Sequence, residues 1–243
     1  MERIHHINHI LNETTMKTKV CLVTGSNGTH MNAAVFGSNP KFEVKIFTRR
    51  PEIFGSEVLA VTNKSPMTWT GKILMASSDP KEACSDCPIF IISCPVNVQE
   101  TLLRQMKPHL PHGAIIGSVF GQGNFELVAK YVLGDDIVSK NFTIFSLFNI
   151  PYTCLTIEPG KKVMMMAMKE YTRPCCTPRT RISEVKLLCE ELWQMPCKPL
   201  DNFLEIILTP GNQIIHPGRV MGVYGNNNIH LMDKQPLFYE DMD

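Results

Sequence analysis

The stretch VCLVTGSNGTH, residues 20–30, decides the fold expected for this chain. It starts with a short apolar run, which is typical of a strand buried on both faces. A turn containing Gly25 and Gly28 follows at once, and residues 30–38 have the composition of a helix. A strand that runs through a glycine turn into a helix places free backbone amides at the carboxyl end of the strand, where an anionic group binds.

The same alternation of apolar runs and helical segments continues along the chain. Residues 42–48, 72–78, 88–93 and 113–120 form further apolar runs. Helical patterns follow three of them, at residues 79–86, at 96–106 and from the Gly121–Gly123 turn to about Leu133. Apolar strands separated by helices indicate a sheet covered on both faces. The sequence therefore predicts an α/β fold with a doubly wound, mostly parallel, Rossmann-like sheet.

After Asn141 the pattern changes. Residues 143–148, 154–158 and 162–168 follow one another with no long helix between them, which predicts an antiparallel or mixed edge of the sheet. The methionines at 164–166 are interpreted as strand core rather than as a metal site. A last helix is predicted at about residues 181–193.

Composition excludes several classes of protein. The 243 residues carry a net charge of +1 and are 44% hydrophobic, so no nucleic-acid or membrane partner is expected. The apolar runs are shorter than the ~20 residues that a membrane-spanning helix needs. Residues 1–16 have no signal-peptide core and are predicted to be a flexible tail. Nine scattered cysteines, with Cys84 and Cys87 in a lone C-x-x-C, favour a reduced cytoplasmic protein without a metal site.

The glycine turn lies where the pyrophosphate of a dinucleotide rests in nucleotide-binding folds. It departs from the G-x-G-x-x-G pattern, since only Gly25 and Gly28 are glycines, and it lacks the G-K-S/T ending of a nucleoside-triphosphate loop. A tight turn without a ligand stays an alternative. A short-chain dehydrogenase is set aside, because no tyrosine is followed by a lysine four residues later.

Arg49 and Arg50 follow the second predicted strand, where the ribose of an adenosine would lie. An acidic residue at this place accepts from the 2′-hydroxyl of NAD, whereas cations suit the 2′-phosphate of NADP. Thr48, Arg49 and Arg50 thus favour NADPH over NADH. Two solvated arginines without a ligand are an equal alternative.

Several stretches in order resemble the octopine/nopaline (opine) dehydrogenase family. GSNGTH resembles that family's G-G-G-N-G-A-H loop, and GQGNFE resembles its G-Q-x-G-F turn. SLFNIPYTC resembles its S-L-x-N/T-L-P-W-x-C segment, and residues 201–219 resemble its N-x-I-x-H-P stretch. The similarity extends from about Lys17 to the end of the chain.

The resemblance implies an NAD(P)H-dependent oxidoreductase that condenses an amino acid with a 2-oxo acid such as pyruvate. The amine and the ketone would form an imine, and the nicotinamide would deliver hydride to its carbon. His216 occupies the catalytic position, where an imidazole suits proton transfer because its pKa lies near neutral pH. Without the resemblance, a lone histidine is more often structural.

The resemblance also implies that Gly25, Asn27 and Gly28 touch the pyrophosphate and that Cys94 and Pro95 lie near the nicotinamide. Ser26 and Thr29 of the same turn, with Arg49 and Arg50 after the second strand, complete the predicted cofactor-binding residues. Gln122 would hold the 2-oxo acid, and Asn212 would bind substrate or order the turn that carries His216.

Two departures from the family lead to alternatives. Thr24, Ser26 and Thr29 replace two glycines and an alanine, so their side chains are expected to crowd the pyrophosphate or the helix–strand contact. The family's helical substrate domain should continue beyond Asp243, so we expect residues 17–205 to form the dinucleotide-binding domain and residues 206–243 an incomplete second one. Its exposed apolar face would favour self-association. The alternatives are a truncated, non-catalytic dinucleotide-binding relative, or a reductase of the ketopantoate or 6-phosphogluconate type.

Overall fold

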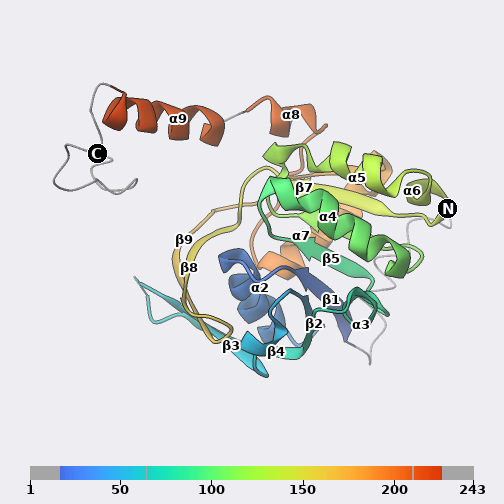
Figure 1. The fold of residues 1–243 in the computed structure, drawn as a ribbon, viewed down its shortest axis with the longest axis horizontal. Helices are drawn as coiled ribbons and strands as arrows, with labels where there is room; N and C mark the ends of the chain where they lie inside the picture. The colour runs from blue at the N-terminus through green and yellow to red at the C-terminus, as the bar shows by residue number, and fades with distance from the viewer. Residues whose placement is uncertain (1–16, 64, 210, 226–243) are drawn as a thin grey trace.

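The computed structural model describes residues 17–63, 65–209 and 211–225, which form one ten-stranded sheet with helices on both sides (Figure 1). The predicted tail at residues 1–16 and the segment after residue 225 lie outside the described residues. The strands are β1 (Thr18–Val23), β2 (Phe42–Phe47), β3 (Glu57–Thr62), β4 (Thr68–Ser77), β5 (Ile89–Ile92), β6 (Ile115–Ser118), β7 (Thr143–Leu147), β8 (Tyr152–Glu158), β9 (Lys162–Met168) and β10 (Pro174–Thr177).

Helices connect most of the parallel strands. They are α2 (Asn27–Ser38), α3 (Pro80–Cys84), α4 (Val96–Met106), α5 (Phe125–Leu133), α6 (Asp136–Ser139), α7 (Ile182–Trp193), α8 (Leu204–Ile207) and α9 (Gly211–Tyr224). Short 3₁₀ turns are η1 (Pro51–Ile53), η2 (Lys107–His109), η3 (Gly121–Gly123) and η4 (Arg179–Arg181). No helix within the described ranges is long and apolar enough to cross a membrane.

The strand order is β10-β7-β6-β5-β1-β2-β4-β3-β9-β8. Its central part, from β4 to β7, is wholly parallel. Taken in chain order, these six parallel strands have the 3-2-1-4-5-6 arrangement of a doubly wound dinucleotide-binding fold. The predicted fold class is confirmed. All carboxyl ends of the parallel strands consequently lie at one edge of the sheet.

The apolar runs form these strands because both of their faces are covered. Every residue of β5, β6 and β7 is buried. Side chains of β1 alternate between two cores, with Val20 and Leu22 on one face and Cys21 and Val23 on the other. A parallel strand in such a position needs no polar face, and this explains why these runs could be recognised from the sequence.

The outer part of the sheet holds two strands that the sequence analysis missed. β3 pairs antiparallel with β4 and parallel with β9, and β10 pairs antiparallel with β7. β8 and β9 form an antiparallel hairpin, so the predicted mixed edge is confirmed. The methionines at 164–166 do lie in a strand, but only Met165 is buried and Met166 is exposed.

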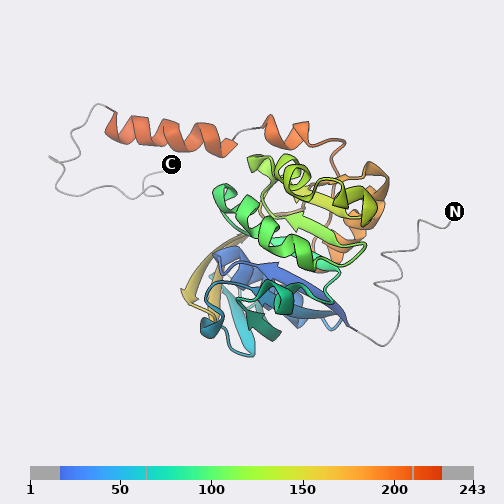
Figure 2. The same ribbon diagram turned by 45° about the vertical axis from the view of Figure 1, so that its right-hand side comes forward.

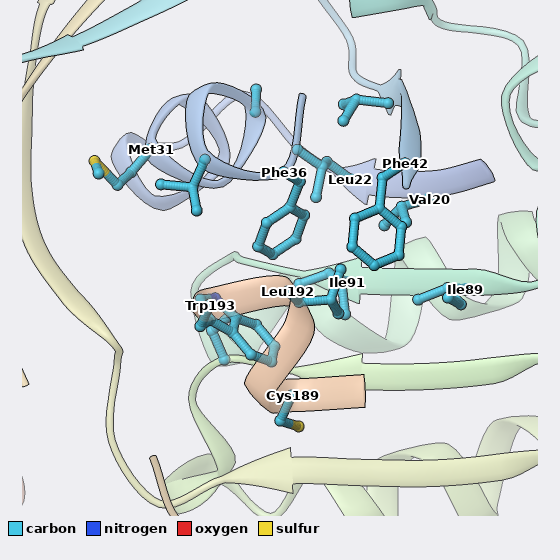
Figure 3. Packing of buried hydrophobic residues seen from close by; sticks show 14 of the residues in the cluster. Val20, Leu22, Met31, Phe36, Phe42, Ile89, Ile91, Cys189, Leu192 and Trp193 are labelled. Carbon is cyan, nitrogen blue, oxygen red and sulfur yellow. The ribbon is translucent and has the colours of Figure 1, made fainter. Parts of the chain in front are cut away.

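Helix α2 is buried all round. The residues of its second and third turns, from Thr29 to Phe36, are all buried, although the helix has no distinct polar and apolar face. Strands β2 and β4, the β8–β9 hairpin and α7 surround it. Figure 3 shows Phe36 of α2 facing Trp193 of α7, with the two rings edge-to-face at 5.5 Å. The Trp193 Nε1 donates to Asn32 Oδ1 at 3.1 Å, which joins the two helices.

Helices α8 and α9 extend from one end of the molecule, and α9 lies apart from the sheet in both views (Figures 1 and 2). Ile214 and Met221 of α9 are 66% and 68% exposed. The apolar face was expected at residues 216–224 and 236–240, and the exposure of Val220 and Met221 agrees with this for the described part, while residues 236–240 lie outside it. Whether these residues belong to a second domain stays a prediction.

Candidate functional site

The largest cavity described lies at the carboxyl ends of β1, β2, β4 and β5 and has a volume of about 800 Å³. It brings together the turn after β1, the arginines after β2 and the segment after β5. Its lining includes Thr24, Gly25, Ser26, Thr48, Arg49, Arg50, Cys94 and Pro95. This is the edge at which open α/β sheets bind ligands.

A second cavity, of about 330 Å³, adjoins the first. Both are lined by Ser26, Cys94 and Pro95. These three residues follow β1 and β5, the neighbouring strands at which the order of the sheet reverses. The second cavity extends from there to Phe120 after β6 and to Ile150 and Tyr152 around the start of β8. The two cavities form a groove across the point where a doubly wound fold binds the two halves of a dinucleotide.

The phosphate loop, defined here as residues 24–29, joins β1 to α2. Ser26 is the N-cap of α2, and its hydroxyl accepts from the Thr29 backbone N–H at 3.2 Å. A Cβ added at Gly28 would lie 2.3 Å from Ser93 Oγ, so only glycine lets α2 approach β5 this closely. At Gly25 an added Cβ would meet Thr48 Oγ1 at 3.2 Å. Each of the two glycines of the loop thus lies so close to a neighbouring residue that an added side chain would crowd it.

The three substituted positions of the loop hold a network of hydroxyl groups. Thr24 Oγ1 donates to the Ser93 carbonyl at 2.7 Å, and it lies 3.2 Å from Thr29 Oγ1. Ser26 Oγ donates to Ser93 Oγ at 3.1 Å. Thr29 is fully buried, and its side chain is directed into the network. The Thr29 side chain, which was expected to crowd the contact between helix and strand, therefore fits between α2 and β1 within this hydrogen-bond network.

Thr24 has an uncommon backbone. Its φ angle is +92°, in a region that favours glycine and strains a β-branched residue. The hydrogen bond to Ser93 offsets part of that strain. Thr24 also lines the larger cavity.

Asn27 and His30 tie α2 to the β8–β9 hairpin. Asn27 Oδ1 accepts from the Thr156 backbone N–H at 3.1 Å. The two ring nitrogens of the buried His30 contact the Ser26 carbonyl and the Gly160 N–H. His30 was part of the stretch that predicted the fold, but the sequence analysis gave it no role, because its partner at Gly160 is distant in sequence.

Arg49 and Arg50 are exposed and line the larger cavity, as expected for residues that follow β2. The buried Thr48 lies behind them, and its hydroxyl accepts from the Arg50 backbone N–H at 3.4 Å. Two cations at the rim of the cavity create a positive potential that attracts phosphate groups.

Cys94 and Pro95 separate β5 from α4 and line both cavities. Burial raises the pKa of the Cys94 thiol to about 12, so this side chain is a neutral wall of the groove rather than a nucleophile. Cys84 and Cys87 of the C-x-x-C are buried in the core with Cys21.

Two buried amide oxygens beyond the parallel strands β6 and β7 have no hydrogen-bond partner within the described part of the chain. They are Gln122 Oε1, in η3, and Asn149 Oδ1, two residues after β7. A buried carbonyl oxygen without a partner is unfavourable, and a bound polar ligand or water would relieve it. Gln122 was predicted from the sequence and Asn149 was not, although Asn149 lies in the segment SLFNIPYTC.

His216 does not line any of the cavities described above. It is exposed on α9, one residue before Pro217, and α9 lies apart from the sheet (Figure 2). Asn212 lies in the first turn of α9, and its side chain is outside the described part of the chain. The structure thus brings together the predicted cofactor residues and leaves the predicted catalytic histidine apart from them.

Comparisons with known proteins agree with this architecture. The chain is 26% identical over 221 residues to an uncharacterized protein of Sinorhizobium fredii, covering 86% of this chain and 57% of that protein. It is 24% identical over 246 residues to octopine dehydrogenase of Pecten maximus, covering 94% of this chain and 60% of that enzyme. No family model matches the sequence.

Solved structures show the same fold. Octopine dehydrogenase with NADH and L-arginine has a TM-score of 0.79 at 23% identity, over 93% of this chain and 59% of that one. An NADP⁺-bound yersinopine dehydrogenase has a TM-score of 0.67 at 12% identity, over 84% of this chain and 53% of that one.

The topology and the groove at the carboxyl ends of its strands define a Rossmann-type α/β fold. Within that fold class the chain is similar to octopine dehydrogenases, as the sequence motifs predicted. It spans about three-fifths of the length of the curated relatives it matches.

Proposed function

We propose that this chain binds NAD(P)H and forms the cofactor-binding part of an opine-dehydrogenase-like oxidoreductase. The observation that carries the proposal is the groove of about 800 Å³ that unites the phosphate loop, Arg49, Arg50 and the Cys94–Pro95 segment. Its position at the carboxyl ends of β1, β2 and β5 is that of the cofactor in doubly wound folds.

The residues of the groove fit a dinucleotide. The backbone amides of Asn27 and Gly28, in the first turn of α2, would hold the pyrophosphate, since these groups lack partners within the helix. Arg49 and Arg50 would contact the adenosine end, and their charges favour the 2′-phosphate of NADPH. The second cavity would take the nicotinamide, which supplies hydride. The walls there are uncharged, with Cys94 held as a thiol.

The substrates follow by analogy with the relatives. Solved octopine dehydrogenases are described with L-arginine and with pyruvate. For this chain we infer reductive condensation of an amino acid with a 2-oxo acid. Gln122, with its unpartnered Oε1, would bind the 2-oxo acid, and His216 would exchange the proton. That role requires His216 to approach the groove. Residues 206–243 would then begin a second domain, after a dinucleotide-binding domain at 17–205.

Cofactor binding is tested by titrating the purified chain with NADPH and with NADH while nicotinamide fluorescence is followed. Arg50→Glu should weaken NADPH binding by at least roughly tenfold, as expected for one charge-assisted contact. Lys72→Glu is the matched control, because it reverses one charge at an exposed residue of β4 outside the groove. If neither nucleotide binds the parent chain, the proposal fails.

A second candidate is a dinucleotide-binding protein that catalyses no hydride transfer. His216 is exposed on α9 and lines neither of the two cavities, and this favours the second candidate. One assay distinguishes the two functions. It measures the oxidation of bound NADPH or NADH in the presence of pyruvate together with L-arginine or another amino acid. Tight nucleotide binding without any oxidation would support the second candidate, whereas oxidation that His216→Ala abolishes would support the first.

A further inference from the structure

Three segments of the chain meet at the side chain of His30. The ring is buried, with 2% of its surface exposed. Its Nδ1 lies 2.8 Å from the carbonyl oxygen of Ser26, the N-cap of α2. On the other side, Nε2 accepts from the Gly160 backbone N–H at 2.7 Å. Because Nε2 is the acceptor, Nδ1 carries the proton and donates to Ser26, so the ring is neutral with both nitrogens used.

The third segment is residues 49–54, which carry the two arginines of the groove. Phe54 ends this segment, and its ring packs against the imidazole with a centroid distance of 4.9 Å. The same ring lies over Gly25, where an added Cβ would be 3.7 Å from Phe54 Cε2. His30 therefore supports Phe54 from one side while Phe54 covers the phosphate loop from the other.

Gly160 connects the hairpin turn to the arginine segment. Its φ angle is +74°, and an added Cβ would be 1.7 Å from the Ile53 carbonyl oxygen. The turn between β8 and β9 is thus pressed onto η1 at a place where only glycine fits. The bond from His30 to Gly160 fixes this turn, while the bond from Asn27 to Thr156 fixes the middle of β8.

We propose that His30 is a positioning residue that holds the phosphate loop, residues 49–54 and the β8–β9 turn in the arrangement that binds a dinucleotide. That the ligand is a dinucleotide rests on the proposed function, whereas the role of His30 in holding the three segments together does not. His30 reaches the groove only through Ser26 and Phe54. Its loss would change the relative positions of the pyrophosphate and adenosine contacts without removing either.

Three substitutions separate the two hydrogen bonds. His30→Phe keeps a ring against Phe54 and removes both bonds. His30→Asn places an amide N–H near the Ser26 carbonyl and does not reach Gly160. His30→Gln places an amide oxygen near the Gly160 N–H and loses the donor to Ser26. Thr172→Val is the stability control, because Thr172 is fully buried and bonded to Cys197 outside the groove.

Hydrogen exchange and nucleotide binding are then measured on the same proteins. His30→Phe should speed amide exchange in residues 24–30 and 156–161 and weaken NADPH or NADH binding by about tenfold, the effect of one or two lost hydrogen bonds. His30→Gln should restore protection at 156–161, and His30→Asn should restore it at 24–30. Thr172→Val should change neither exchange in these segments nor affinity.

The outcomes keep this proposal apart from the proposed function. Unchanged exchange in both segments of His30→Phe would overturn it. An equal loss of affinity in Thr172→Val would also overturn it, because general destabilisation would then explain the effect. If the parent chain binds neither nucleotide, the proposed function fails, and the exchange pattern alone decides whether His30 holds the three segments together.

Discussion

Thr24 Oγ1 donates a hydrogen bond of 2.7 Å to the carbonyl oxygen of Ser93 and so joins the carboxyl ends of β1 and β5. These two strands flank the point where the sheet order reverses and where the groove is centred. The bond compensates for a threonine at φ +92°. A residue unfavourable for the backbone is thus held by a contact that glycine could not make.

We expect Thr24→Val to be more harmful than Thr24→Gly. Valine keeps a β-branched side chain at a positive φ and loses the hydrogen bonds, so we expect a loss of about 1–3 kcal/mol in the free energy of unfolding. Glycine loses the same bonds but relieves the backbone strain. Urea unfolding of both variants measures the difference. A larger loss for Thr24→Gly would show that Thr24 is not strained.

Gly28→Ala should destabilise the contact between α2 and β5, since the new methyl group would lie 2.3 Å from Ser93 Oγ. Overpacking of this kind costs about 1–3 kcal/mol. The double variant Gly28→Ala/Ser93→Ala removes the clashing oxygen, so part of the stability should return. Unfolding curves of the two single variants and the double variant form a cycle. Strict additivity of the two single effects would contradict the contact.

Lys45→Met should destabilise the protein although Lys45 carries a charge. Its side chain is 7% exposed, and its ammonium group donates to the carbonyls of Glu82 and Ser85 and to Asp86, at 3.0 to 3.2 Å. Removing it leaves the carboxyl end of α3 without these donors, at a cost of about 1–3 kcal/mol. Lys19→Met is the control, because Lys19 pairs with the same Asp86 but is more exposed. Equal unfolding midpoints for both variants would refute this expectation.

Stability should fall in mild acid because of His30. Burial lowers the pKa of this imidazole, and the nearby Arg50 lowers it further, against the opposing effect of the Ser26 carbonyl. The exposed Glu52, Glu158 and Lys161 belong to the segments packed around it. As pH falls, the unfolded chain binds the proton at this histidine before the folded protein does. The stability that the neutral His30 gives the fold is therefore complete above the ordinary pKa of 6.5 and is lost as pH falls below that value.

The measurement is the free energy of unfolding as a function of pH, for the parent chain and for His30→Gln. The glutamine variant cannot titrate at this position, so its stability should change less as pH falls below about 6.5. Identical pH profiles would show that His30 is not the group responsible.

Cys94 should react slowly with iodoacetamide although it borders the groove. Burial raises the pKa of its thiol to about 12, so almost no thiolate is present at neutral pH. Mass spectrometry of the labelled chain, with the unfolded chain as the reference for full reactivity, gives the rate. Labelling of folded Cys94 as fast as in the unfolded chain would contradict a buried, protonated thiol.

The inner parallel strands could be predicted because their whole length is apolar. The runs around Val20, Ile46, Ile91 and Ile116 carry this signal within a few residues, and the glycine turn after Val23 marks the ligand-binding edge. β3 and β10 were missed for the opposite reason. β3 is partly exposed, and β10 begins with a proline and holds no branched aliphatic or aromatic side chain, so the local pattern of neither strand distinguishes it from a loop.

The candidate site divides in the same way. The turn after β1, the arginines after β2 and the Cys94–Pro95 segment were predictable, because a parallel sheet brings the carboxyl ends of its strands to one edge. The roles of Ser93 and Asn149 depend on which side chains face each other across that edge. The spacing of residues along the sequence does not indicate which side chains will face each other there.

By itself, the sequence determined the parallel core, the position of the glycine turn after β1 and the resemblance to the opine dehydrogenases. Each depends on short runs of residues whose apolar or glycine character is local. Only the tertiary structure decided how the loop is held. It joined Thr24 to Ser93 and His30 to Gly160, pairs separated by 69 and 130 positions. A hydrogen bond requires two atoms at about 3 Å, and for such distant partners only the folded sheet sets that distance.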